Sequence, residues 1–189
     1  MRKTQEVFFM SKTNRTKLLA YSAICVTLAL VLSQIRLFSM PQGGSVSAFS
    51  MLFIVLVGYW FGPKAGIPAG LAYGFLRIFL GAFIIHPAQF ALDYLVPSAA
   101  LGAFGFFSDK KWGLYFAYIV GVTVAFFSYF ASGIIFFSHF APEGQHVAVF
   151  SAVYNLSHVV PEMVMTLILI SMPPVRKAIE HVSRQAVAA

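Results

Sequence analysis

The stretch HPAQFALDYLVPSAALG, residues 86–102, places Gln89, Asp93 and Tyr94 in one of the most apolar parts of the chain. A charged side chain in hydrocarbon costs about 2.5–3.5 kcal/mol on insertion scales, so we expect Asp93 to have a function or a partner. Gln89 and Asp93 are four residues apart and therefore share one face of a helix. A carboxylate beside aromatic rings is a suitable site for an organic cation or a flat heteroaromatic ring.

A second polar stripe lies near the C-terminus, where Ser151, Asn155, His158 and Glu162 follow the i, i+4, i+7, i+11 spacing of one helix face. Two polar stripes on apolar helices are expected to face each other or water, because lipid satisfies neither. Asn155 offers both donors and acceptors to the edge of a neutral ring. His158 joins the binding candidates, although a satisfied core histidine is the simpler interpretation, and Glu162 fits a structural role slightly better than a ligand contact.

Arg77 opens an alternative for Asp93. It lies eight residues before Ile85, which places it about 12 Å below the outer surface if the segment is helical. Asp93 is at a depth of about 9 Å on the next segment and Asn155 at about 12 Å on the last one. Arg77 and Asp93 could therefore form a structural ion pair, and the sequence alone leaves this alternative beside ligand binding.

Aromatic residues gather around the same depth, at Tyr129, Phe130, Phe136, Phe137, Phe150 and Tyr154. Most fit lipid contact or packing, and a subset beside Asp93 would enclose a ring. The loop FSMPQGGSVS has a Gly-Gly turn that could form a mobile lid over such a site, with Gln42, Gly43, Gly44 and Ser45 at its tip. A plain tight connector is the alternative.

The elements that must position these residues are membrane helices. The 189 residues have a mean hydropathy of +0.82 and are only 10% charged, against about 25% in soluble domains. Six apolar segments are each close to the length of about 20 residues that spans a bilayer: 18–35, 46–61, 65–85, 88–107, 113–137 and 147–172. We therefore predict an all-α, multi-pass protein of the cell membrane with six transmembrane helices.

Basic residues set the predicted orientation. If the N-terminus is cytoplasmic, the outer loops hold only Arg36, whereas the cytoplasmic flanks hold Arg2, Lys3, Lys12, Arg15, Lys17, Lys64, Lys110, Lys111, Arg176, Lys177 and Arg184. This asymmetry predicts that both termini are cytoplasmic. It predicts an N-terminal leader over 1–17, a membrane domain over 18–172 and a cytoplasmic tail over 173–189. It also accounts for the net charge of +7 without nucleic acid as a partner.

Several function classes lack their motifs. The chain has no G-x-x-x-x-G-K-[ST] loop for ATP, and neither a G-x-S-x-G nor an H-E-x-x-H motif for hydrolysis, so an enzyme is disfavoured. The single cysteine, Cys25, excludes an internal disulfide and disfavours a metal cluster. No cofactor is expected. A stand-alone secondary transporter, with Asp93 or Glu162 carrying protons, remains an alternative.

Five ordered segments resemble one family: MPQGGSVSAFSMLFIVLVGYWFGPKAG, LAYGF, HPAQFALDY, SGIIFF with APEG, and YNLSHVVPE. Together they resemble the thiamine-specific substrate-binding (S) subunits of energy-coupling factor (ECF) transporters, the ThiT or YuaJ family, over about residues 18–172. The resemblance implies a six-helix fold of the ECF S-component type that captures thiamine from outside. It also implies a transmembrane coupling protein and two cytoplasmic ATPases as partners.

The resemblance also assigns residues. It implies substrate contacts at Asp93, Tyr94, Gly133 and Asn155, and coupling-subunit contacts at Ala23 and at Thr27, where the family has a second alanine. Tyr129, Phe137 and Phe150 stand where the family has histidine, tryptophan and tyrosine. These departures leave a relative of thiamine, such as a pyrimidine precursor, as an alternative ligand.

Overall fold

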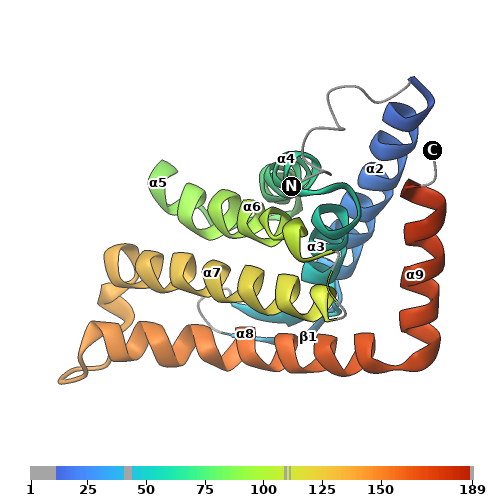
Figure 1. Cartoon of the computed structure of the whole chain (residues 1–189). Helices are drawn as coiled ribbons and strands as arrows, with labels where there is room; N and C mark the ends of the chain where they lie inside the picture. The colour runs from blue at the N-terminus through green and yellow to red at the C-terminus, as the bar shows by residue number, and fades with distance from the viewer. Residues whose placement is uncertain (1–11, 41–43, 109, 111, 188–189) are drawn as a thin grey trace.

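The computed structural model describes residues 12–40, 44–108, 110 and 112–187, and these are predominantly helical (Figure 1). The α-helices are α2 (Lys12–Gln34), α3 (Ser50–Phe61), α4 (Pro63–Leu76), α5 (Pro87–Phe90), α6 (Val96–Ala103), α7 (Gly113–Phe136), α8 (Val147–Ser171) and α9 (Pro173–Val187). Three 3-10 turns, η1 (Arg77–Leu80), η3 (Gly105–Phe107) and η4 (Ser138–Phe140), and a π turn, η2 (Ala91–Leu95), complete the helical elements.

Four helical spans within the described residues are long and apolar enough to cross a membrane: Arg15–Gln34, Pro87–Phe107, Gly113–Phe136 and Val147–Ser171. The third predicted segment is divided, because α4 ends at Leu76 and the 3-10 turn η1 follows it. The apolar helix Ser50–Phe61 is shorter than the other spans. The predicted helical, membrane-spanning character is therefore confirmed, with four spans of full length.

The predicted all-α class is confirmed, and the predicted start of the second apolar segment at Val46 is corrected by a short hairpin in the first loop. Strands β1 (Arg36–Ser39) and β2 (Ser45–Ser47) form an antiparallel hairpin there, and α3 begins at Ser50 rather than at Val46. Alternating polar and apolar residues in SVS suit a strand whose two faces differ. Phe49 has the left-handed φ of 62° immediately before α3, which turns the chain from the strand into the helix.

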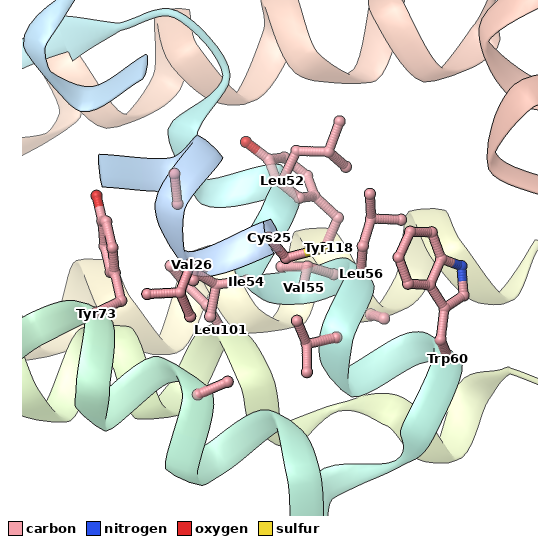
Figure 2. Packing of buried hydrophobic residues seen from close by; sticks show 14 of the residues in the cluster. Cys25, Val26, Leu52, Ile54, Val55, Leu56, Trp60, Tyr73, Leu101 and Tyr118 are labelled. Carbon is pink, nitrogen blue, oxygen red and sulfur yellow. The ribbon is translucent and has the colours of Figure 1, made fainter. Parts of the chain in front are cut away.

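The core lies around α3, whose side chains contact α2, α4, α6 and α7. Figure 2 shows Leu52, Ile54, Val55 and Leu56 of α3 packed among buried residues of the neighbouring helices. α4 and α6 pack closely against each other. There is no room for a side chain at Gly70, where a Cβ would overlap the backbone carbonyl of Ser98. Small residues at this contact let two helix backbones approach, as is typical of membrane helices.

The two ends of the bundle differ. The start of α5 and the connection between α7 and α8 lie at one end, whereas the start of α7 and the end of α8 lie at the other (Figure 1). At this second end, α9 turns sharply away from α8 and contacts α2 and α3. The segment predicted as a C-terminal tail is therefore helical and packed over Pro173–Val187.

Candidate functional site

Asp93 and Tyr94 lie in the π turn that joins α5 to α6. The backbone N–H of Val96 donates to Ala91 rather than to Leu92, and Pro97 has no N–H to donate. The carbonyl of Leu92 instead accepts a hydrogen bond of 2.6 Å from the Ser128 hydroxyl of α7. A proline and a serine on a neighbouring helix thus stabilise the wider turn, and π turns of this kind are frequent at functional sites.

Gln89 fixes the Asp93 carboxylate and the segment before α5. Its side-chain amide donates to Asp93 Oδ2 at 2.5 Å and to the carbonyl of Phe83 at 3.1 Å, and its Oε1 accepts from the N–H of Ile85 at 3.2 Å. The N–H of Phe83 donates to the Tyr94 hydroxyl at 3.0 Å. The predicted shared face of Gln89 and Asp93 is confirmed, and Gln89 is 1% exposed.

Arg77 does not form an ion pair with Asp93. Its guanidinium carbon lies 4.9 Å from the centre of the Tyr94 ring and 5.9 Å from that of Tyr73, both within cation–π range. Its charge still acts on Asp93 and Glu162 from a distance. The structural ion pair considered from the sequence is therefore absent among the described residues, and stacking on tyrosine rings takes its place.

The facing wall comes from α7 and α8. Asn155 donates to the carbonyl of Ser151 at 2.9 Å, and the Ser151 hydroxyl donates to the carbonyl of Phe130 at 2.9 Å. A Cβ at Gly133 would overlap that hydroxyl, so glycine permits α7 to approach α8 at this level. His158 lies beside the rings of Tyr154 and Tyr129, with centroid distances of 5.6 Å and 6.4 Å.

Glu162 joins α8 to the hairpin. Its carboxylate accepts hydrogen bonds from the N–H of Ser47 at 3.0 Å, from the Ser47 hydroxyl at 2.9 Å and from the Ser50 hydroxyl at 3.4 Å. Further along the hairpin, the N–H of Gly44 donates to the Tyr154 hydroxyl at 2.8 Å. A Cβ at Gly44 would lie 2.9 Å from that hydroxyl oxygen, so a larger residue would have to displace the Tyr154 side chain. The hairpin is held at both levels by α8.

These walls enclose one cavity. Its lining includes all nine residues predicted to bind substrate: Gln89, Asp93, Tyr94, Tyr129, Gly133, Phe137, Phe150, Asn155 and His158. Gly44 and Ser45 of the predicted lid line it too, whereas Gln42 and Gly43 lie outside the described residues. The two positions assigned to partner contact, Ala23 and Thr27, lie elsewhere, on an exposed face of α2.

Sequence reasoning did not place several other lining residues in the site: Ser33, Ser47, Ser50, Met51, Tyr73, Phe83, Ser98 and Leu101. Tyr73 and Ser98 sit on α4 and α6 beside the glycines of the close contact, so small-residue spacing is a signal that could have indicated the inward face. Ser47 and Ser50 could be linked to Glu162 only once the hairpin was known.

The fold and the cavity together define an all-helical, multi-pass membrane protein that encloses a polar, aromatic-lined binding site beneath a hairpin. The family model described as thiamine transporter protein matches residues 19–181, so this chain belongs to the thiamine transporter family and is a transport protein rather than an enzyme. The resemblance identified from the sequence segments is thereby confirmed.

Proteins similar to this chain include two curated relatives and a solved structure. The thiamine transporter ThiT of Bacillus subtilis is 33% identical over 177 residues, with 85% of this chain and 92% of the relative covered. That of Lacticaseibacillus paracasei is 24% identical over 170 residues, covering 79% and 82%. The structure of ThiT from Listeria monocytogenes aligns with a TM-score of 0.72 at 25% identity, covering 85% of this chain and 96% of that chain.

Proposed function

We propose that this chain is the substrate-capture subunit of an ECF-type vitamin importer that binds thiamine from outside the cell. In this proposal the chain crosses the membrane six times, over 18–172, with the leader 1–17 and the tail 173–189 in the cytoplasm. A transmembrane coupling protein and two cytoplasmic ATPases supply the energy. The absence of a nucleotide-binding loop from the sequence agrees with this division of labour.

The observation that carries the proposal is the charge balance of the cavity. Its charged lining consists of Arg77, Asp93 and Glu162, which leaves one net negative charge when both carboxylates are ionised. Glu162 accepts hydrogen bonds from an N–H and two hydroxyls, which hold its carboxylate in place at the cavity wall. A monocation such as thiamine neutralises this site, so its buried charge is compensated on binding.

The remaining lining suits the two rings of thiamine. Asp93 faces the thiazolium cation, Asn155 bonds the aminopyrimidine, and Tyr94, Phe137 and Phe150 form aromatic walls. Tyr129 offers a hydroxyl in place of the imidazole at the position where the family has histidine, and it lines the same cavity. The hairpin with Gly44 and Ser45 acts as the lid.

The second candidate is a stand-alone secondary transporter in which Asp93 or Glu162 carries a proton. Both carboxylates line the cavity, where either could exchange a proton with a bound substrate or with water. The hydrogen bonds that engage Glu162 with the hairpin favour an anchoring role over proton transfer. Flux through this chain alone in proteoliposomes, driven by a proton gradient, would favour the second candidate.

Equilibrium titration of the purified chain with thiamine tests the proposal. We expect tight binding without nucleotide, and at least tenfold weaker binding of 4-amino-5-hydroxymethyl-2-methylpyrimidine, which lacks the thiazolium charge. Preference for the neutral pyrimidine would instead identify a precursor as the ligand. Retention of the two ATPases and the coupling protein on the tagged chain during purification would support the ECF mechanism, and their reproducible absence would count against it.

A further inference from the structure

Arg77 poses a problem for a site that binds a cation. Its side chain lines the cavity, yet its guanidinium makes no hydrogen bond or ion pair with the residues that the structure describes. The contacts it does make are with the faces of the Tyr94 and Tyr73 rings, which hold the flat group without using its N–H donors. Arg77 is half-buried, so water can reach these donors when no ligand is bound, and a ligand that displaces this water has to supply an acceptor in its place.

The neighbouring tyrosine is fixed in place, so it cannot turn to serve Arg77. The Tyr94 hydroxyl accepts from the N–H of Phe83 at 3.0 Å, and Asp93 is engaged by Gln89 at 2.5 Å. Glu162 already accepts hydrogen bonds from the serines of the hairpin and of α3. These three groups are thus engaged by other partners, and the donors of Arg77 remain available in the cavity beside the Tyr94 ring.

We propose that Arg77 forms a subsite that donates hydrogen bonds to an uncharged oxygen acceptor at one end of the ligand. The inference rests on the proposed function and deepens it: in thiamine the acceptor is the hydroxyl of the hydroxyethyl arm, which is attached to the thiazolium ring. Arg77 and Asp93 then act as a pair of opposite sign. Asp93 balances the charge of the thiazolium ring, and Arg77 donates a hydrogen bond to the hydroxyl of the arm attached to that ring.

The charge of the cavity determines whether Arg77 binds a hydroxyl or a phosphate ester. A guanidinium alone would favour a phosphate, but Asp93 and Glu162 line the same cavity. A phosphate monoester adds up to two negative charges to a site that already carries one net negative charge when Asp93 and Glu162 are ionised. Repulsion in this partly desolvated cavity therefore selects the free alcohol.

The test is a cycle of two ligands and two proteins, measured as dissociation constants on purified protein. The ligands are thiamine and its deoxy analogue, in which the hydroxyethyl arm is an ethyl group. Wild-type protein should bind thiamine about tenfold or more tightly than the analogue, because a hydrogen bond to a charged donor is lost. Arg77→Met should remove this preference, while binding the analogue as well as wild-type protein does or better, since a nearby positive charge is gone.

Arg36→Met is the matched control, because it removes the same charge from an exposed residue of β1 outside the cavity lining. It should keep the full preference for thiamine. Binding of the analogue by Arg77→Met would show that this variant is folded. If it binds neither ligand, Arg77→Lys replaces it in the test; this variant keeps a cationic donor and should retain part of the preference for thiamine. Wild-type protein should bind thiamine monophosphate at least tenfold more weakly than thiamine.

Three outcomes overturn the subsite while leaving thiamine capture intact. The first is an unchanged preference of Arg77→Met for thiamine over the deoxy analogue. The second is the lack of this preference in Arg77→Lys, if Arg77→Met is unfolded. The third is tighter binding of the monophosphate than of thiamine by wild-type protein. Failure of wild-type protein to bind either thiamine or its analogue would overturn the proposed function instead.

Discussion

Asp93 and Glu162 are the two carboxylates of the cavity, and their surroundings give them different roles. Asp93 has one strong fixed partner, Gln89, within a turn that lines the cavity. Glu162 is 1% exposed and is bound by the N–H and hydroxyl of Ser47 and by the Ser50 hydroxyl. We therefore propose that Asp93 recognises the ligand charge and that Glu162 retains the hairpin.

Asp93→Asn keeps the size of the side chain and an oxygen that can accept from Gln89. Because it leaves the bound cation without its counter-charge, it should weaken thiamine binding by more than about 2 kcal/mol. Binding of the neutral pyrimidine should change little. Titration of both ligands checks this. Since Arg77 is not ion-paired with Asp93, adding Arg77→Met should not restore binding. Restored binding in the double variant would instead support a structural ion pair between the two residues.

Glu162→Gln replaces an acceptor-only group with an amide whose NH₂ faces donors. At least one of the bonds to Ser47 or Ser50 is lost, which should lower the free energy of unfolding by about 1.5–3 kcal/mol. The melting temperature in detergent measures this, and limited proteolysis should cleave sooner between β1 and α3. Glu143→Gln, an exposed change in the connection between α7 and α8, is the control. An unchanged melting temperature would refute the anchoring role.

Among the elements, the π turn shows how local chemistry shapes the site. A regular α-helix through Asp93 would direct the carbonyl of Leu92 to Val96, whereas here Ser128 of α7 satisfies it. The element that carries Asp93 and Tyr94 is thereby attached to a second helix. Loss of the hydrogen bond between Ser128 and the Leu92 carbonyl should therefore shift the position of the Asp93 carboxylate.

Ser128→Ala tests that connection. It leaves the Leu92 carbonyl without its donor in an apolar environment, at a cost of about 1–3 kcal/mol of stability. Thiamine binding should weaken as well, because the turn that holds Asp93 loses a fixed position. Melting temperature and titration report both effects. Ser157→Ala provides a comparison, since that hydroxyl is exposed and bonds only within α8; an equal response would show that the Ser128 contact has no special role.

The sequence was informative about helices and faces, and less so about junctions. Periodicity placed Asn155, His158 and Glu162 on one face, and the structure lines the cavity with all three. The hairpin was missed because SVS is too short to be distinguished from the start of an apolar helix. The stacking of Arg77 on Tyr94 depends on how η1 ends α4, which is a tertiary effect that spacing alone does not encode.

At the scale of the whole molecule, the proposed topology assigns opposite sides of the membrane to the two ends of the bundle. A cysteine at Glu143, which is exposed between α7 and α8, should react with an impermeant maleimide added to intact cells. One at Lys110, which is exposed before α7, should react only after the membrane is opened. The native Cys25 is 4% exposed, so background labelling should be small. The reverse pattern would contradict the orientation.

The separation of the cavity from α2 leads to the last prediction. Thr27 and Ala23 lie on an exposed face of α2 and are absent from the cavity lining, so a bulky residue there need not disturb the site. Thr27→Trp should leave the dissociation constant for thiamine within about twofold of wild-type protein, because no cavity contact changes. It should abolish uptake by the proposed importer complex, since the close helix contact that we propose with a coupling protein would tolerate only small residues. Thr123→Trp, on the exposed surface of α7, is the matched control and should retain uptake. Radiolabelled uptake in cells and titration of purified protein separate the two steps, and a parallel loss of binding and uptake in Thr27→Trp would show that capture and coupling are not divided between these surfaces.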